Sequence, residues 1–304
     1  MKKRYLTLIT VGLLLAITLT VLLVSRSRAY DLVHPTRSYP QRTPDNFAID
    51  NWQNITLETE DGLRLAGWYI PPQPAADGAT IIFGHGFSGN RGNLLAQAAL
   101  LIQRGYGALL FDFRNHGDSE GEITTFGLLE VRDVAAALAF LLAQPEVNPE
   151  RIGLVGHSMG GAIAIRAAAQ MPEIKAVVVE SSYTSLQDNV VEGVRFIARL
   201  PAFPFAPLII FLGQREAGMD IRVRPVEEVS QIAPRPILFI HGEADRFISP
   251  ENSRRLYAAA GDPKELYILP NVGHIDILEQ NSDEFVERFV GFFDHYLREA
   301  SSAP

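Results

Sequence analysis

The sequence predicts an α/β fold in which a mostly parallel sheet of about eight strands is covered by helices on both faces. Two observations lead to this prediction. Short apolar runs typical of buried strands alternate with segments of helical periodicity, which is the pattern of parallel strands joined by crossover helices. Hydrophobic residues make up 47% of the 304-residue chain and charged residues 20%, so the chain can bury a substantial core.

The predicted strands and helices follow one pattern from residue 52 onward. The runs 55–59 and 63–70 flank Asp61-Gly62, a dipeptide typical of a hairpin turn, so we expect them to add antiparallel strands at one edge. The other apolar runs, interpreted as buried strands, lie at 80–83, 107–111, 152–155, 176–179, 237–240 and 266–269. Helical periodicity separates most of them, at about 92–104, 127–143, 159–170, 251–260 and 282–298.

Residues 183–235 do not follow this alternation. Within them, 194–213 is strongly apolar, but three prolines and two arginines interrupt it and make a second membrane span unfavourable. We therefore expect an insertion of short helices over the carboxyl edge of the sheet. Such a lid would cover the functional site and shape an apolar acyl pocket.

The N-terminal residues 1–28 are typical of a signal anchor that spans a membrane. Residues 6–24 carry no charge, and at ~1.5 Å per residue they cross most of a ~30 Å hydrocarbon core. This run is longer than the apolar part of a secretory signal, about 7–15 residues, and it ends at SRSRA, a poor cleavage site. We expect an uncleaved anchor with the folded domain outside the cytoplasm; a cleaved signal and a secreted protein are the alternative. A polar linker, 29–51, would follow.

The charge balance argues against a nucleic-acid-binding function. The chain has a formal net charge of −8, and because residues 1–28 hold five basic and no acidic residues, the remainder carries −13. An acidic domain without a basic stripe is not expected to bind nucleic acid or polyanionic substrates. The chain has no cysteine, which excludes disulfides, thiolate catalysis and zinc–cysteine sites.

A candidate nucleophile, Ser158, lies in the pentapeptide GHSMG at 156–160, between a predicted strand and a predicted helix. In a G-x-S-x-G turn of this kind the serine is strained and its hydroxyl is exposed. Larger side chains two residues to either side would clash, so glycine is needed there. A second match, GDSEG at 117–121, follows a polar stretch and precedes no helical pattern, so we interpret Ser119 as part of a surface turn.

A serine nucleophile needs a base and an acid that orients the base. His274 follows the predicted strand 266–269 and is the candidate base, because open α/β sheets place their sites at the carboxyl ends of strands. Asp245 follows the predicted strand 237–240 and is the candidate acid. Glu243 and Asp276 are the alternatives for this acid.

The donors for a developing oxyanion are expected from the backbone. The candidates are the N–H group of Met159, directly after the nucleophile, and that of Phe87, in the loop after the predicted strand 80–83. The remaining histidines near these segments, interpreted as turn, packing or structural residues, are His85, His116, His157 and His241.

Five segments, in this order, resemble the α/β-hydrolase superfamily: HGF at 85–87, DFRNHGDS at 112–119, GHSMG at 156–160, HGEAD at 241–245 and GH at 273–274. The chain is most similar to bacterial membrane-anchored or secreted serine hydrolases, which are grouped with serine aminopeptidases and acyl thioesterases. The resemblance implies an α/β-hydrolase domain over 52–300 with a lid at about 183–235. It also implies a triad and an oxyanion hole, formed by Ser158, Asp245 and His274 and by the amides of Phe87 and Met159.

These residues predict a serine hydrolase that cleaves carboxylic esters or thioesters through an acyl-enzyme, with no cofactor and no metal. A serine peptidase or amidase of the same fold is one alternative, because the same triad serves both chemistries. A catalytically inactive, membrane-tethered binding module is the other, although every expected catalytic position is filled.

Overall fold

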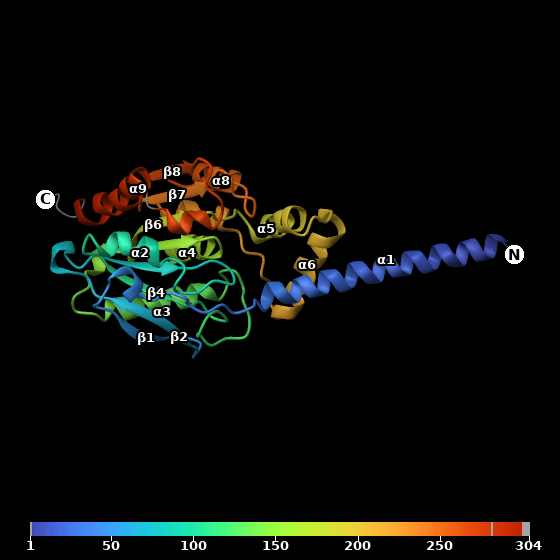
Figure 1. Ribbon diagram of the computed structural model, residues 1–304, viewed down its shortest axis with the longest axis horizontal. Coiled ribbons are helices and arrows are strands. Elements are labelled where there is room, and N and C mark those ends of the chain that lie inside the picture. Colours follow the sequence, from blue (N-terminus) through green and yellow to red (C-terminus); the bar gives the residue numbers. More distant parts are fainter. Residues whose placement is uncertain (1, 281, 300–304) are drawn as a thin grey trace.

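The computed structural model describes residues 2–280 and 282–299 and confirms the predicted fold class (Figure 1). Met1 and the expected domain end at residue 300 lie outside the described residues. Eight strands of the described chain form one sheet in the order β1-β2-β4-β3-β5-β6-β7-β8. They are β1 (Gln53–Glu58), β2 (Arg64–Ile70), β3 (Thr80–Gly84), β4 (Gly107–Phe111), β5 (Ile152–His157), β6 (Ile174–Glu180), β7 (Ile237–Gly242) and β8 (Lys264–Leu269).

The strand directions match the expected mixture of one antiparallel edge and a parallel body. β1 pairs with β2, and β2 with β4, in antiparallel fashion, whereas every pairing from β4 through β3 to β8 is parallel. The β1–β2 turn includes Gly62 at φ +84°, a backbone conformation that side chains disfavour. Parallel pairing brings the carboxyl ends of β3, β5, β6, β7 and β8 to one edge, where their following loops meet.

Helices cover both faces of the sheet, and two separate apolar cores lie beneath them. α2 (Leu95–Ile102) and α9 (Asp283–Phe293) pack on one face. α3 (Glu130–Leu142), α4 (Met159–Gln170) and α8 (Glu251–Ala259) pack on the other. Neighbouring residues of one strand divide between the two cores, as Ile81 and Ile82 of β3 do. Short helical turns lie at Pro44–Phe47, Pro74–Ala76, Pro149–Arg151, Val229–Ile232, Asp276–Glu279 and Asp294–Glu299.

Helices make up much of the segment 183–235, which the sequence analysis interpreted as an insertion. It comprises α5 (Leu186–Glu192), a π-helical segment (Gly193–Ile197), α6 (Ala202–Ala217) and α7 (Pro225–Glu228). The α5–α6 hairpin projects from the carboxyl edge of the sheet and lies beside the N-terminal helix (Figure 1).

The N-terminal helix, α1 (Lys2–Val33), continues past residue 28, where the sequence pattern placed the end of the anchor. It is long and apolar enough to cross a membrane, and its most hydrophobic window is not buried by the domain. Figure 1 shows it projecting away from the body of the molecule. Its last turns are different, because Ser25, Ala29 and Val33 are buried.

The polar segment that follows α1 is bound to the domain, although its composition suggested a linker. The guanidinium of Arg37 donates to the backbone carbonyls of Gly117, Ser119 and Gly121. The hydroxyl of Ser38 donates to the carbonyl of Ser88, at 2.6 Å. These bonds satisfy backbone carbonyl groups of two loops. The composition of the segment alone does not reveal this binding.

Candidate active site

The turn between β5 and α4 holds Ser158 in a strained backbone conformation, with φ 56° and ψ −115°. Such a conformation costs about 1–3 kcal/mol and needs support from its surroundings. A Cβ at Gly156 would lie 2.2 Å from the carbonyl oxygen of Gly160, and one at Gly160 would lie 2.1 Å from that of Gly84. Both glycines are therefore required by close backbone approach, as the pentapeptide suggested.

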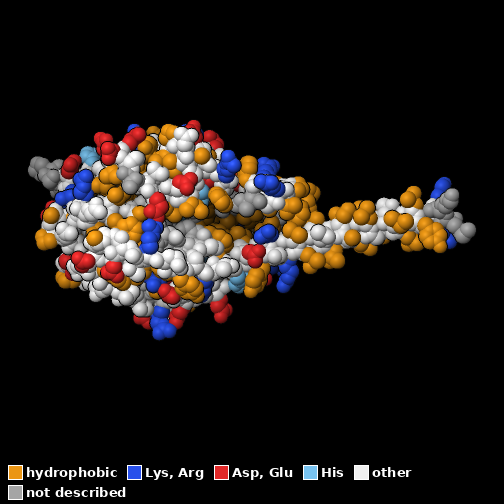
Figure 2. All heavy atoms as spheres, in the orientation of Figure 1, with side chains coloured by type: hydrophobic (Ala, Val, Ile, Leu, Met, Phe, Trp, Pro, Cys, Tyr) orange, Lys and Arg blue, Asp and Glu red, His pale blue; other side chains and the backbone are white. Residues whose placement is uncertain are grey.

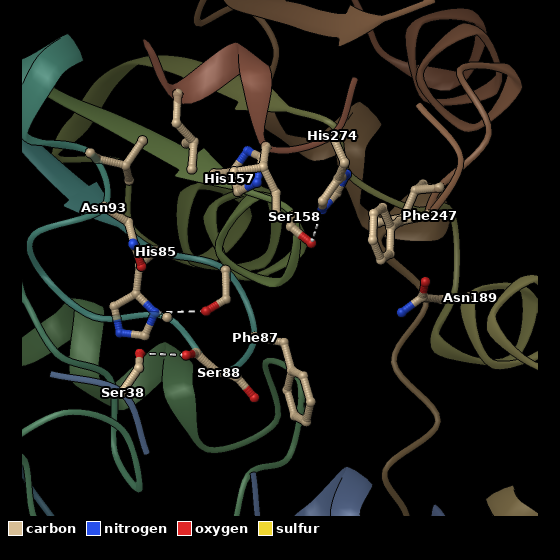
Figure 3. Close-up of a pocket in the computed structure, with 16 residues that line it drawn as sticks. Ser38, His85, Phe87, Ser88, Asn93, His157, Ser158, Asn189, Phe247 and His274 are labelled. Atoms are coloured by element: carbon tan, nitrogen blue, oxygen red, sulfur yellow. Dashed lines mark hydrogen bonds between the residues drawn. The ribbon is translucent and has the colours of Figure 1, made fainter. Parts of the chain in front are cut away.

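The structure brings together the three side chains that the sequence singled out as a triad. Two of them, Ser158 and His274, are drawn in Figure 3. The loop after β8 carries His274, whose Nε2 lies 3.1 Å from the Oγ of Ser158. The loop after β7 carries Asp245, whose Oδ2 lies 2.6 Å from the Nδ1 of His274. Because the carboxylate accepts a hydrogen bond from the Nδ1–H group, the lone pair of Nε2 is directed at the serine hydroxyl.

Asp245 is held as a carboxylate by several donors. Burial alone would raise its pKa, but hydrogen bonds from His241 and His274 outweigh burial and keep the pKa well below its usual range. Its Oδ1 also accepts the backbone N–H groups of Phe247 and Ile248. The buried acid therefore has a fixed orientation toward the imidazole.

His241, interpreted from the sequence as structural, contacts the candidate acid directly. Its Nε2 lies 3.2 Å from the Oδ2 of Asp245 and 3.0 Å from the carbonyl oxygen of Ile248. Its Nδ1 is bonded to the hydroxyl of Ser253, at 2.7 Å. In the sequence, His241 lies at the end of a predicted strand and four residues before Asp245. That spacing alone could not show that the two side chains are in contact.

The two backbone segments expected to supply oxyanion donors lie against each other. A Cβ at Gly86 would be 3.2 Å from the Cβ of Ser158, so the loop that carries Phe87 passes directly beside the serine. Met159 is the first residue of α4, where helix N–H groups lack partners within the helix. Both candidate amides thus belong to segments that adjoin Ser158.

Three other histidines near the site are held neutral by burial. The pKa of His85 and that of His116 are lowered to about 4, and the pKa of His157 is lowered well below its usual value. His85 bonds to the carbonyl of Gly86 through Nδ1 and accepts the N–H of Phe113 through Nε2. It therefore ties two loops together and has no nitrogen free to act as a base.

The second G-x-S-x-G match is a turn, as interpreted, but Ser119 is buried in it and not at the surface. Ser119 donates its hydroxyl to the carbonyl of Asp112, at 2.6 Å, and accepts the N–H of Ala66, at 2.9 Å. Of the alternative acids, Glu243 is exposed, and Asp276 accepts the N–H of Gly273 in the turn before the histidine. The structure brings none of these three side chains to the imidazole of the candidate base.

A cavity of about 450 Å³ opens beside the serine hydroxyl. Ser158 and His274 lie on one side of it, and Phe87, Phe247 and Asn189 lie around the other (Figure 3). Asn189 belongs to α5, so the lid contributes to the wall. No Asp, Glu, Lys or Arg is among the described residues that line the cavity.

A buried polar cluster behind Ser158 was not anticipated from the sequence. Burial raises the pKa of Glu180, at the end of β6, to about 8. Its Oε1 accepts a hydrogen bond from Gln97 at 2.9 Å, and its Oε2 lies 3.8 Å from the Nδ1 of His157. The ring of His157 in turn lies 4.8 Å from that of His274, so this cluster supports the base from behind.

Metal ligands do not gather in the part of the chain that the structure describes. No group of three or more His, Cys, Asp or Glu side chains there could hold a metal ion. The arrangement beside the cavity is instead a hydroxyl, an imidazole and a carboxylate in series. Such a series can activate a hydroxyl for attack on a carbonyl carbon.

An eight-stranded, mostly parallel sheet with this serine turn defines an α/β hydrolase. The chain belongs to the alpha/beta hydrolase family, whose model matches residues 81–288. It is 30% identical to the protein YfhR of Escherichia coli (strain K12) over 262 residues, which are 82% of this chain and 84% of that one.

Two solved esterase structures are also similar. An esterase of Pyrococcus furiosus superposes with a TM-score of 0.73 at 27% identity, covering 88% of this chain and 98% of that one. The esterase domain of a Rhodothermus marinus protein superposes with a TM-score of 0.58 at 26% identity, covering 81% and 99%. These similarities support a hydrolase.

Proposed function

We propose that this chain is a serine hydrolase that cleaves carboxylic esters or thioesters through an acyl-enzyme. The observation that carries the proposal is the continuous path from the Oγ of Ser158 to Nε2 of His274, at 3.1 Å, and from Nδ1 to Asp245, at 2.6 Å. This geometry allows proton transfer from the hydroxyl to the imidazole as the oxygen attacks a carbonyl carbon.

The proposed reaction has two balanced halves. The Oγ of Ser158 bonds to the acyl carbon while His274 takes its proton, and that proton then leaves on the alcohol or thiol as the ester bond breaks. Water next attacks the acyl-enzyme, gives a proton to the same imidazole and releases the acid and the free serine. Asp245 stays ionised throughout and stabilises the imidazolium.

The amides of Phe87 and Met159 are proposed to bind the oxyanion of both tetrahedral intermediates. Two features support this role: the loop after β3 passes beside Ser158, and Met159 opens a helix whose N-terminal dipole favours negative charge. Loss of one such donor typically costs ~10²–10³ in rate.

The cavity favours a neutral acyl group over a free aminoacyl substrate. An aminopeptidase needs an anionic partner for the substrate ammonium, because a buried unpaired charge is costly. The described lining residues offer no carboxylate. Esterase structures among the similar proteins point the same way.

The experiment compares two substrate classes on the full-length chain in detergent. We expect turnover of p-nitrophenyl acyl esters to exceed that of aminoacyl anilides, with Ser158→Ala inactive on both. Faster turnover of the anilides would favour a peptidase or amidase. Turnover of neither class, with the protein folded, would favour the binding-module alternative.

We also propose that α1 anchors the protein in a membrane with the hydrolase domain outside the cytoplasm. The support is its uncharged run and the exposure of that run beyond the domain. Protease added to intact cells is expected to digest the domain. Protection of the domain would place it inside, and recovery of the domain without α1 in the medium would indicate a cleaved signal.

A further inference from the structure

The lid and the N-terminal helix are packed as one unit. The buried residues Ser25, Ala29 and Val33 recur every four positions, so they form one face of α1. A Cβ at Gly213 of α6 would lie 3.6 Å from Leu32 and 4.0 Å from Val33, within ordinary contact of α1. The orientation of the lid is therefore fixed to the helix that carries the proposed anchor.

This packing holds the end of the lid close to where the uncharged run of α1 finishes. Residues 25–33 rise by only ~14 Å along the helix, because each residue adds ~1.5 Å. Figure 1 shows the α5–α6 hairpin beside α1, farther out along it than the body of the domain. Val21 and Val24, in the last turns of the uncharged run, are also partly buried against the apolar core that includes α6.

Large hydrophobic side chains are exposed at the tip of the lid, which is unusual for a surface that faces water. The side chains of Phe196 and Phe203 are 63% and 81% exposed. Arg195 and Arg199, in the same segment, are also exposed, and neither forms an ion pair with a described residue. Figure 2 shows hydrophobic side chains gathered where α1 leaves the domain.

The charge of this region is opposite to that of the rest of the domain. Residues 194–224 hold five arginines and two acidic residues, within a part of the chain that otherwise carries excess negative charge. Phenylalanine rings and arginines together are typical of segments that lie at a membrane interface, where the ring enters the boundary between headgroups and acyl chains and the guanidinium meets phosphate. Anionic lipid is thus complementary to this surface, and the packing of the lid against α1 places the surface beside the proposed anchor.

We propose that the lid tip, residues 195–203, is a membrane-contact surface. Phe196 and Phe203 insert at the headgroup level of the leaflet from which α1 emerges, and Arg195 and Arg199 bind the phosphates of anionic lipids. This inference rests on the proposed anchor. It deepens the proposed function, because α5 of the same lid lines the cavity through Asn189, so a lid tip at the bilayer brings the cavity near the membrane surface. A lid held at the bilayer selects acyl esters that reside in the membrane as substrates.

The absence of cysteine allows a direct test with single nitroxide labels. The full-length chain with Phe203→Cys is labelled and placed, one copy per disc, in nanodiscs of phosphatidylcholine and phosphatidylglycerol in equal parts. Collision rates with oxygen and with a water-soluble nickel chelate then report depth. Leu142→Cys, at the exposed C-terminal end of α3, is the water-facing control, and Leu14→Cys, in the uncharged run, is the bilayer control.

We expect the nickel collision rate at position 203 to be several-fold lower than at 142, and the oxygen rate to be higher. If the nickel collision rate at position 203 equals that at position 142, while position 14 is protected from nickel, the membrane-contact inference is wrong and the proposed anchor is unaffected. Nickel access at 14 would overturn the anchor and the inference together. Neither result bears on the hydrolase, which is assayed separately against Ser158→Ala.

The arginines are tested in the same discs. Replacing phosphatidylglycerol by phosphatidylcholine is expected to raise the nickel collision rate at 203, and Arg195→Gln with Arg199→Gln is expected to remove that lipid dependence. A rate at 203 that ignores lipid charge in the unmodified background would contradict the role given to the arginines. Protection of 203 only in discs that hold two copies would show that a second chain, and not lipid, covers the surface.

Discussion

Two regions of this molecule carry the same G-x-S-x-G pattern and use it in opposite ways. In the turn at 156–160 the glycines permit close contact between backbones, and Ser158 takes the positive φ itself. In the turn at 117–121 the glycines take the positive φ, at +47° and +110°, and Ser119 is buried by its hydrogen bonds. Strain on the serine exposes one hydroxyl, whereas relaxed geometry buries the other.

The difference shows what gives the pattern its meaning. Ser158 stands between strand β5 and helix α4, which begins at the next residue, and its side chain lines the cavity. Ser119 is followed by a turn bound to Arg37 and to strand β2. The pentapeptide therefore identifies a nucleophile only together with the elements on either side.

The largest expected effect separates the two serines. Ser158→Ala should lower kcat for a p-nitrophenyl ester by at least about 10⁴-fold, because the attacking atom is lost. Ser119→Ala should leave kcat within a few-fold but reduce the free energy of unfolding by about 1–3 kcal/mol, since two buried backbone groups lose a partner. Steady-state kinetics and urea unfolding measure both. Equal losses of kcat would contradict the contrast.

Asp245, the candidate acid bonded to His274, gives the next largest effect. Asp245→Asn should lower kcat by about 10⁴-fold with little change in folding, because the amide favours the wrong imidazole tautomer. His241→Gln, one contact farther out, should cause a smaller loss. A larger loss in His241→Gln than in Asp245→Asn would contradict the role given to the carboxylate.

A substitution at Gly160 tests the close contact between its backbone and the carbonyl oxygen of Gly84. Gly160→Ala should abolish most activity and destabilise the fold, because its Cβ would meet the Gly84 carbonyl oxygen at 2.1 Å. Gly291→Ala is the matched control, since nothing lies within 4 Å of a Cβ there and α9 should gain about 0.5–1 kcal/mol. Thermal unfolding and kcat follow both. Full activity in Gly160→Ala would show that the turn can relax.

The smallest effect concerns the buried cluster behind the nucleophile. The pKa of Glu180 is about 8 in the fold against a usual 4.5, so folding takes up a proton between these values. The free energy of unfolding should therefore fall as pH rises from about 5 to about 8, by up to a few kcal/mol. Glu180→Gln, which can still accept from Gln97, should flatten that fall. Parallel curves for the two proteins in urea titrations would rule out this role.

Much of the fold was predictable because strands buried on both faces leave continuous apolar runs. Each expected strand and each principal helix was found, with ends shifted by a few residues. The continuation of α1 to Val33 was missed, because α1 packs against α6, which is distant in sequence. The binding of Arg37 to a remote loop was missed for the same reason.

The candidate site was predictable where chain order carries information. The structure brings Ser158, Asp245 and His274 together as their order along the chain suggested, though their catalytic role stays a prediction. The contacts of His241 and Glu180 could not be read from spacing, because each depends on which strand ends meet at the edge of the sheet.

The most direct test of the central claim is to map where a fluorophosphonate probe bonds to the full-length folded chain. We predict a single adduct on the peptide that contains Ser158, lost in Ser158→Ala and kept in Ser119→Ala. An adduct on another serine, or no adduct on folded protein, would contradict the account.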